Sequence, residues 1–417
     1  MPKLTVKRLI LLLAGALLLA GLVYSLPPVQ KRLSWRIDLA LAYLRGVINP
    51  VEGMPTPLTV DDQPAVTRPG ATSTPTARTT ATPEQTRSTP TLQPSPTQIP
   101  GSISLPAPAW EKQDINNCGP ASLAMYLRYY GWDKDQFDIA NLLKPQRDDR
   151  NVNVDELAYY VRTRAGWLNA EYRVGGDLTT LKKLLAAGIP VIIEESFYFD
   201  EPFWPNDDLW AAHYNLITGY DDASQTFTGQ DSFHGADQKI PYTTLEEYWH
   251  TFNHVYLMVY PPEREATVRD ILGEQWDPAT NRQRALEGSQ RETQSHPSDP
   301  FAWFNLGSQL VYFERYADAA SAFDKARELG LPQRMLRYQF SPFFAYFHTG
   351  RNDELLALTE YALQITPNAE EALLWHGWAL YRDGDTAGAL ADFQNALVQN
   401  PNYQDAQYAL QFVRENP

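Results

Sequence analysis

The last third of the chain repeats itself, and this repetition restricts the folds open to it. Small residues and prolines recur at intervals of 34 to 36 residues: Ala326, Ala362 and Ala396, and Pro367 and Pro401. A period of this length is typical of helix pairs that bury their apolar faces only by stacking on neighbouring pairs. We therefore predict an all-α array over residues 299–417, with three repeats and a capping helix at 402–416.

The anchor residues of the first repeat resemble those of tetratricopeptide repeats. They are Trp303, Leu306, Gly307, Ala319, Phe323 and Ala326. The resemblance implies a solenoid that binds or scaffolds a protein partner. A weaker helical pattern at 263–298 is predicted to connect this array to the preceding domain.

The N-terminus carries a membrane signal. Lys3, Lys7 and Arg8 precede residues 9–26, which hold no charge and are at the short end for a spanning helix. A cleavable signal peptide is the competing interpretation, but no Ala-x-Ala cleavage site follows. Residues 1–50 are therefore predicted to hold a single-pass signal anchor in the cell membrane, with the folded body extracytoplasmic. The basic, amphipathic stretch 34–48 is interpreted as a membrane-surface helix or as a helical stalk.

A spacer follows at residues 51–104. Between residues 68 and 100, 17 of 33 residues are Thr or Pro. Such a segment has too little apolar surface to offset the entropy of ordering it, so we predict a disordered tether.

The net charge and the cysteine count limit the classes of function that the chain can have. The net charge is −15 and no basic face stands out, which argues against a nucleic-acid partner. Cys118 is the only cysteine. An odd cysteine in an exported chain forms an intermolecular bridge or is a reactive thiol, although a small buried apolar residue is a third interpretation.

Residues 105–262 predict an α+β domain in which helices come first and an antiparallel sheet second. The predicted helices start at Cys118, at Asn153 with Glu156 as its capping partner, and at Asp177. The predicted strands are 189–194, a hairpin over 213–233 that turns near 222–224, and 255–260.

Cys118 stands at the start of its helix, with Pro120 in the first turn. The helix dipole and the unpaired amides stabilise a thiolate there, which is the nucleophile of a cysteine hydrolase. His213 is the best candidate base. If the hairpin turns at Ala223, His213 lies opposite Phe233, and Asp231 falls on the face of His213 at a diagonal position.

This geometry depends on the register, because a shift of one residue would send Asp231 to the other face. Asn215 is the alternative orienting residue for His213. Gln113, five residues before Cys118, is the candidate oxyanion donor beside the Cys118 amide. No metal-ligand spacing stands out around His234, His250 and His254, so neither a metal nor a cofactor is expected.

The stretch QDINNCGPASLAMYLRYYG resembles the catalytic-cysteine motif of the bacteriocin-processing (double-glycine) peptidases and their papain-like relatives. AHYNLITGYDD and GQDSF are similar to that family's histidine and aspartate motifs, in the same order. The resemblance implies a papain-like fold in which Cys118 is the nucleophile, His213 the base, Asp231 its orienting acid and Gln113 the oxyanion donor. It covers about 150 residues of the chain, and Asp231 is followed by Ser where the family often has Pro.

The sequence thus predicts a membrane-tethered cysteine peptidase that acts on a peptide or protein substrate and recruits a protein partner through its repeats. Double-glycine specificity is not carried over, because the chain has no nucleotide-binding motif. The alternatives are a non-catalytic peptide-binding scaffold of the cell envelope, and an amidase or transpeptidase with the same acyl-enzyme chemistry. The aromatic segment 195–210 is interpreted either as the wall of a substrate groove or as a lid over the core.

Overall fold

The computed structural model describes residues 14–15, 18–19, 21–58, 99–147, 149 and 151–416. Much of the predicted signal anchor and most of the predicted linker therefore lie outside the described residues. In the part of the chain that is described, no helix is both long enough and apolar enough to cross a bilayer.

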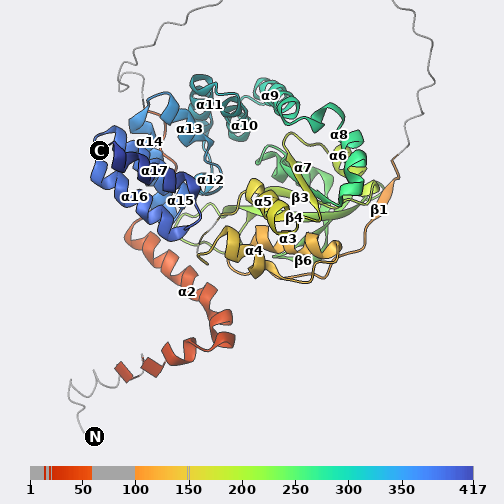
Figure 1. Cartoon of the computed structure of the whole chain (residues 1–417), viewed down its shortest axis with the longest axis horizontal. Coiled ribbons are helices and arrows are strands. Elements are labelled where there is room, and N and C mark those ends of the chain that lie inside the picture. Colours follow the sequence, from red (N-terminus) through yellow and green to blue (C-terminus); the bar gives the residue numbers. More distant parts are fainter. Residues whose placement is uncertain are drawn as a thin grey trace, which may run out of the picture.

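Two folded bodies lie side by side, a sheet with helices on both faces and an array of helices (Figure 1). The sheet has seven strands in the order β2-β7-β3-β4-β5-β6, with β1 paired to β4, and every pair is antiparallel. The strands are β1 Ser102–Ser104, β2 Asn169–Arg173, β3 Val191–Tyr198, β4 Trp210–Asp221, β5 Thr226–Asp231, β6 Gly235–Pro241 and β7 Tyr256–Tyr260. The antiparallel sheet is as predicted, but β1, β2 and β6 were not.

Successive apolar side chains of the central strands point to opposite sides of the sheet, so both faces of the sheet are apolar. Helices cover each face. Ile192, Leu216 and Leu257 pack under α3, α4 and α5, whereas Ile193, Ile217 and Met258 pack under α6, α7 and α8. These helices are α3 Cys118–Tyr129, α4 Gln136–Leu143, α5 Val154–Arg164, α6 Leu178–Ala186, α7 Tyr242–His250 and α8 Glu265–Leu272. Period-two burial on both faces explains why β3 and β7 read as continuous apolar runs.

Local signals set the helix ends. The Asn153 amide donates to Glu156 at 2.7 Å, which is the predicted capping contact at the start of α5. Asp177 accepts from the Thr180 amide at 2.7 Å at the start of α6. Gly131 follows α3 with a φ of +88°, a conformation that suits glycine at a helix end.

The C-terminal region is helical, as predicted. It comprises α9 Pro278–Ser295, α10 Pro300–Tyr312, α11 Tyr316–Leu329, the short α12 Met335–Tyr338, α13 Ser341–His348, α14 Asn352–Ile365, α15 Glu370–Arg382, α16 Thr386–Gln399 and α17 Gln404–Glu415. A Cβ on Gly307 would lie 2.6 Å from the Phe323 ring, and one on Gly377 would lie 2.6 Å from the Phe393 ring. Glycine on the first helix of a pair thus admits the phenylalanine of the second.

The helical array is fixed to the sheet domain by the β3–β4 loop. Arg334, which precedes α12, forms a two-pronged ion pair with Asp207, with N–O distances of 2.5 and 2.6 Å. Both side chains are buried, with exposed fractions of 1% and 0%. The Trp204 indole donates to Gln333 at 2.8 Å, and Trp210 stacks on Phe252. This loop therefore belongs to both bodies.

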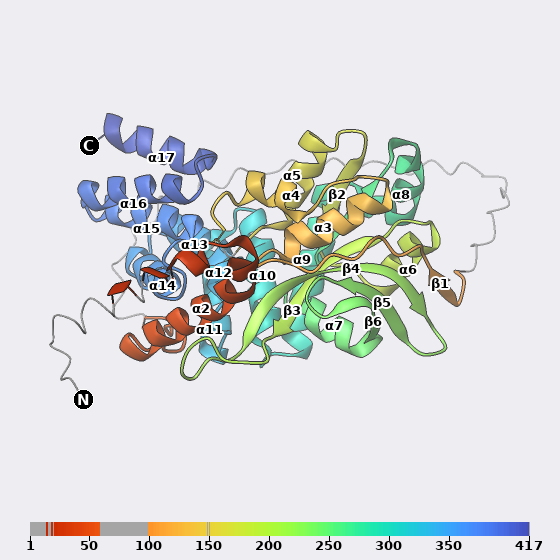
Figure 2. The same ribbon diagram turned by 90° about the horizontal axis from the view of Figure 1, so that it is seen from below.

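A long N-terminal helix, α2 (Pro27–Ile48), meets the two bodies at its C-terminal end and runs away from them toward its N-terminal end (Figure 1 and Figure 2). Close packing holds its C-terminal end, because a Cβ on Gly46 would lie 2.4 Å from the Cβ of Trp204. Residues 49–58 then run along the helical array without helical or strand structure.

Candidate active site

A cavity of about 490 Å³ opens where the sheet domain, the helical array and α2 meet. Cys118, His213 and Gln113 line it from the sheet domain. Tyr338 of α12 and Arg36 of α2 complete its wall. The cavity therefore gathers three of the predicted site residues, and the two other segments also border it.

Cys118 is the first residue of α3, so its side chain lies at the positive end of the helix dipole. Burial acts to raise the pKa of the Cys118 thiol. The hydrogen bond and charge of His213, with the amides of Tyr214 and Gly119, outweigh burial and lower that pKa below its ordinary value. The thiol is therefore set up to ionise more readily than a free cysteine.

The loop before α3 is fixed by side chains of α4. The buried Gln136 accepts from the Asp114 amide at 2.7 Å and from the Asn117 side chain at 2.9 Å. Lys144 donates to the Asn116 carbonyl at 3.0 Å. Asn116 has a φ of +55°, a left-handed conformation that asparagine tolerates better than most residues. These contacts position Cys118 at the end of the loop.

His213 lies on β4 between Cys118 and Asp231. Its Nε2 is 3.0 Å from Asp231 Oδ1, which leaves Nδ1 for the hydrogen bond to Cys118. Burial acts to lower the pKa of His213, but the hydrogen bonds and charges of Asp231 and Cys118 raise it well above its usual range. Burial likewise opposes the low pKa of Asp231, which His213 and the His234 contacts nonetheless hold below its ordinary value.

A β-bulge brings Asp231 to His213. Near the turn, Tyr220 pairs with Phe227, and if this register continued, Asp231 would fall on the other face of the hairpin. The register shifts between Ile217 and Gly219, and beyond the shift Leu216 pairs with Gln230. The extra residue in β4 restores the diagonal relation of His213 and Asp231.

Asp231 has further partners that the sequence did not indicate. Its Oδ1 accepts from the Phe233 and His234 amides at 2.7 and 3.0 Å, and its Oδ2 lies 2.8 Å from His234 Nδ1. Trp110 donates from its indole to the Asp231 carbonyl at 2.8 Å. These contacts hold the carboxylate in one orientation and favour its ionised form.

Gln113 is held by the residue that follows Asp231. The Ser232 hydroxyl donates to the side-chain oxygen of Gln113, Oε1, at 2.8 Å, and the backbone amide of Gln113 donates to the Ser232 carbonyl at 2.9 Å. With its oxygen occupied, Gln113 directs its Nε2 donors elsewhere, and the residue lines the cavity that holds Cys118. Ser232, where the resembling family often has Pro, is therefore the positioning residue for Gln113.

If Gln113 is the oxyanion donor that the sequence predicts, Ser232→Ala is expected to lower kcat about 5- to 20-fold with little change in KM. A single oxyanion donor contributes about 10²- to 10³-fold, and this change only loosens the donor. The measurement is steady-state cleavage of a peptide substrate. Ser224→Ala, in the exposed turn of the same hairpin, is the matched control. Equal kcat values for the two variants would contradict the positioning role.

Two buried glutamates on β3 were not predicted as site residues. Glu195 pairs across the sheet with His213, and burial raises its pKa to about 7 against the opposing charge of His213. Glu194 lines the cavity, and burial together with the charge of Cys118 raises its pKa well above its ordinary value. Asn215, the alternative orienting residue, instead donates to Glu195 at 3.0 Å.

The three histidines considered as metal ligands each lie beside a carboxylate. His234 contacts Asp231, His250 lies 2.9 Å from Glu292, and His254 lies 3.1 Å from Glu246.

The aromatic segment 195–210 lies partly against the cavity and partly in the core. Phe197, Phe199 and Phe203 line the cavity, whereas Trp204 and Trp210 are buried against the helical array. Phe197 also lies 5.2 Å from His213, measured between ring centroids. A substrate in the cavity would therefore meet an aromatic wall on one side.

The family comparison agrees with this architecture. Residues 103–257 match the model of the peptidase C39-like family. A curated relative, the cytochrome c-type biogenesis protein CycH of Pseudomonas aeruginosa, is 30% identical over 124 residues. That match covers 29% of this chain and 30% of the relative, so the chain spans under a third of the relative's length.

Solved structures with similarity to the chain fall into two groups. A C39-like peptidase from Bacillus anthracis is 19% identical with a TM-score of 0.31, covering 38% of this chain and 96% of that one. YrrB, a TPR protein, is 21% identical with a TM-score of 0.30, covering 36% of this chain and 74% of that one. Residues 103–257 therefore match the peptidase C39-like family model, and the region that follows them is helical.

Proposed function

We propose that this chain is a cysteine peptidase in which Cys118, His213, Asp231 and Gln113 act together on a peptide bond. The observation that supports this most strongly is the position of His213, whose Nε2 lies 3.0 Å from Asp231 and whose interaction with Cys118 lowers the pKa of the thiol. This chain of contacts is what a thiol nucleophile requires from a base and its orienting acid.

The reaction follows from these positions. The Cys118 thiolate attacks the carbonyl carbon of the scissile bond, and the oxyanion accepts hydrogen bonds from Gln113 Nε2 and the Cys118 amide. The tetrahedral intermediate collapses as His213 gives its Nδ1 proton to the leaving nitrogen, which departs as an amine. His213 then takes a proton from water, whose oxygen attacks the thioester, and the second collapse releases a carboxylic acid and restores the thiolate.

The cavity favours a peptide with an aromatic or aliphatic side chain near the scissile bond. Phe197, Phe199 and Phe203 supply an apolar wall, and Tyr338 extends it onto the helical array. We propose that the array recruits the substrate protein or a partner, since one of its residues already borders the cavity.

The test is the rate of Cys118 alkylation by iodoacetamide as a function of pH. A thiol with a lowered pKa and an imidazolium partner should react fast at pH 6. In His213→Ala the thiol returns to an ordinary pKa, so its ionised fraction at pH 6 is about 0.3%, and the rate is expected to fall on the order of 100-fold.

His250→Ala is the control for this experiment, because His250 pairs with Glu292 away from the thiol. It should leave the alkylation profile of the parent unchanged. A parent chain with an ordinary thiol profile would overturn the proposal and favour the non-catalytic scaffold.

The membrane tether is also part of the proposal. α2 carries a stripe of exposed apolar side chains at helical spacing: Leu33, Ile37, Leu41, Leu44 and Ile48. This stripe follows the uncharged run 9–26, so the two segments together suit a chain that enters a bilayer and leaves along its surface, with the folded body extracytoplasmic.

Cells that produce the full chain test the tether. The parent is expected in the membrane fraction after alkaline carbonate extraction. Leu12→Arg with Leu18→Arg should release it, since each arginine costs about 2.5–3.5 kcal/mol at the centre of a spanning helix. Leu12→Ala with Leu18→Ala is the matched control and should stay in the membrane. Release of the parent chain from the membrane by carbonate would contradict the proposed membrane tether.

A further inference from the structure

Residues 49–58, here called the strap, lie against α11 and α14 of the helical array, and the surface of the two helices that the strap contacts is here called the groove. The strap contacts the array through its backbone. Arg327 of α11 donates to the Pro55 carbonyl at 2.9 Å, and the Leu58 amide donates to Glu354 of α14 at 2.7 Å. Tyr361 and Gln364 of α14 donate to the Glu52 and Pro50 carbonyls at 3.3 and 3.0 Å.

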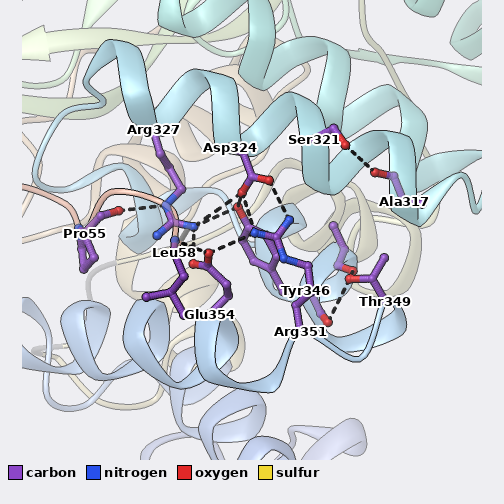
Figure 3. A network of polar contacts seen from close by, with 11 residues as sticks. Pro55, Leu58, Ala317, Ser321, Asp324, Arg327, Tyr346, Thr349, Arg351 and Glu354 are labelled. Carbon is purple, nitrogen blue, oxygen red and sulfur yellow. Dashed lines mark hydrogen bonds and ion pairs between the residues drawn. The ribbon is translucent and has the colours of Figure 1, made fainter. Parts of the chain in front are cut away.

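The strap covers a buried network of charges (Figure 3). Arg327 and Glu354 form an ion pair at 2.6 Å, with side chains 1% and 2% exposed. Arg351 joins them by contacting Glu354 at 3.0 Å and Asp324 at 2.6 Å. The strap supplies this network with one acceptor, at Pro55, and one donor, at Leu58. Buried charges need such partners, so the strap occupies a place that a peptide backbone suits.

The sequence of the strap suits an extended ligand. Pro55 and Pro57 hold the backbone extended before it binds, which reduces the entropy lost on docking. Val51 and Met54 pack into the apolar core that the array shares with the sheet domain. The helical array thus forms its hydrogen bonds with the backbone of the strap, and the apolar side chains of the strap set its position along the two helices.

The strap also fixes the position of α2. The helix ends at Ile48, and the strap begins at the next residue. Arg36 of α2 lines the cavity that holds Cys118, and α2 packs on the β3–β4 loop at Gly46, beside Trp204. A docked strap therefore keeps α2 beside the candidate active site, and a released strap would leave only the contacts of α2 itself.

We infer that the groove between α11 and α14 is a binding site for an extended peptide and that the strap is its ligand in cis. We infer further that this docking keeps Arg36 of α2 in the wall of the Cys118 cavity. Undocking of the strap exposes the cavity. The statement about the cavity rests on the proposed function of Cys118, whereas the statement about the groove does not.

A fluorescent peptide with the sequence of residues 49–58 tests the groove in the full chain. In the parent the strap competes at the high effective concentration of a tethered ligand. Val51→Asp places a charge in the apolar contact, and Leu58→Pro removes the amide that donates to Glu354 without changing the array. Both variants are expected to bind the peptide about 10-fold or more tightly than the parent.

Thr56→Ala is the matched control, because the Thr56 side chain is exposed, and it should bind the peptide as the parent does. A peptide of the same composition in scrambled order should bind none of the chains. Equal binding of the strap peptide by parent, Val51→Asp and Leu58→Pro, or binding by none of them, would overturn the assignment of the groove.

Alkylation of Cys118 by two reagents tests the cavity. The ratio of the rates for a bulky fluorescein maleimide and for iodoacetamide reports access and cancels changes in thiol ionisation. This ratio is expected to rise about 10-fold in Val51→Asp and Leu58→Pro and to stay unchanged in Thr56→Ala. An unchanged ratio in all variants would overturn the inference that strap docking limits access to Cys118. Slow iodoacetamide labelling of the parent at pH 6 would count against the proposed function alone.

Discussion

Replacing Cys118 with alanine is expected to abolish peptide cleavage, with a loss of kcat on the order of 10⁴- to 10⁶-fold. The reason is chemical, because the mechanism has no other group that can form the acyl intermediate. His213 and Asp231 would remain bonded to each other but would have no thiol to activate. The measurement is mass-spectrometric profiling of a mixed peptide library with the full chain.

The control for this variant must separate chemistry from binding. Cys118→Ala leaves the aromatic wall of Phe197, Phe199 and Phe203 intact, so any peptide cleaved by the parent should still bind, which fluorescence anisotropy can measure. Cys118→Ser should also be inactive, since a hydroxyl does not ionise beside His213 as a thiol does. Cleavage by Cys118→Ala at the rate of the parent would refute the mechanism.

The helical region was predictable because its signals are local. The contact of Gly307 with Phe323 joins residues only one helix apart, and it recurs 70 residues later as Gly377 with Phe393. Such a pattern can be read from one sequence, since each helix pair repeats the same packing problem. The same holds for the cap formed by Asn153 and Glu156, whose partners are three residues apart.

The relation between His213 and Asp231 was predictable only in part. Placing the turn at Ala223 gave the register that the structure has beyond Ile217, with His213 diagonal to Asp231. Nearer the turn the register differs by one residue, and the bulge between Ile217 and Gly219 compensates for it. Nothing in the sequence marked this bulge. The partners His234 and Ser232 could have been suspected from their nearness to Asp231 alone.

The contacts between distant segments could not be read from the sequence. Arg334 and Asp207 are 127 residues apart, and Arg327 contacts the carbonyl of Pro55 from 272 residues away. Neither pair belongs to a periodic pattern, and exposed arginines and aspartates are common on any surface. The site depends on these contacts nonetheless, because the β3–β4 loop that supplies Phe199 and Phe203 is held by Arg334.

Arg334→Met is therefore expected to destabilise the full chain by about 3–5 kcal/mol, because it leaves the Asp207 carboxylate buried without its ion-pair partner. Burial acts to raise the pKa of Asp207, but Arg334 and the amides of Phe203 and Leu209 hold that pKa below its ordinary value. A carboxylate with a lowered pKa stabilises the fold above its unfolded pKa of about 3.9, and this contribution is lost as the pH falls through the folded pKa.

Urea unfolding at pH 7, followed by tryptophan fluorescence and circular dichroism, gives the size of this effect. Arg315→Ala is the matched control on the same array, since Arg315 pairs with Asp318 where both side chains are about half exposed. It should change stability by less than about 1 kcal/mol. The double variant Arg334→Met with Asp207→Leu should recover much of the loss, because it leaves no unpaired buried charge. A single variant as stable as the Arg315 control would mean that the two bodies are held together without this ion pair, and the aromatic wall of the cavity would then need another support.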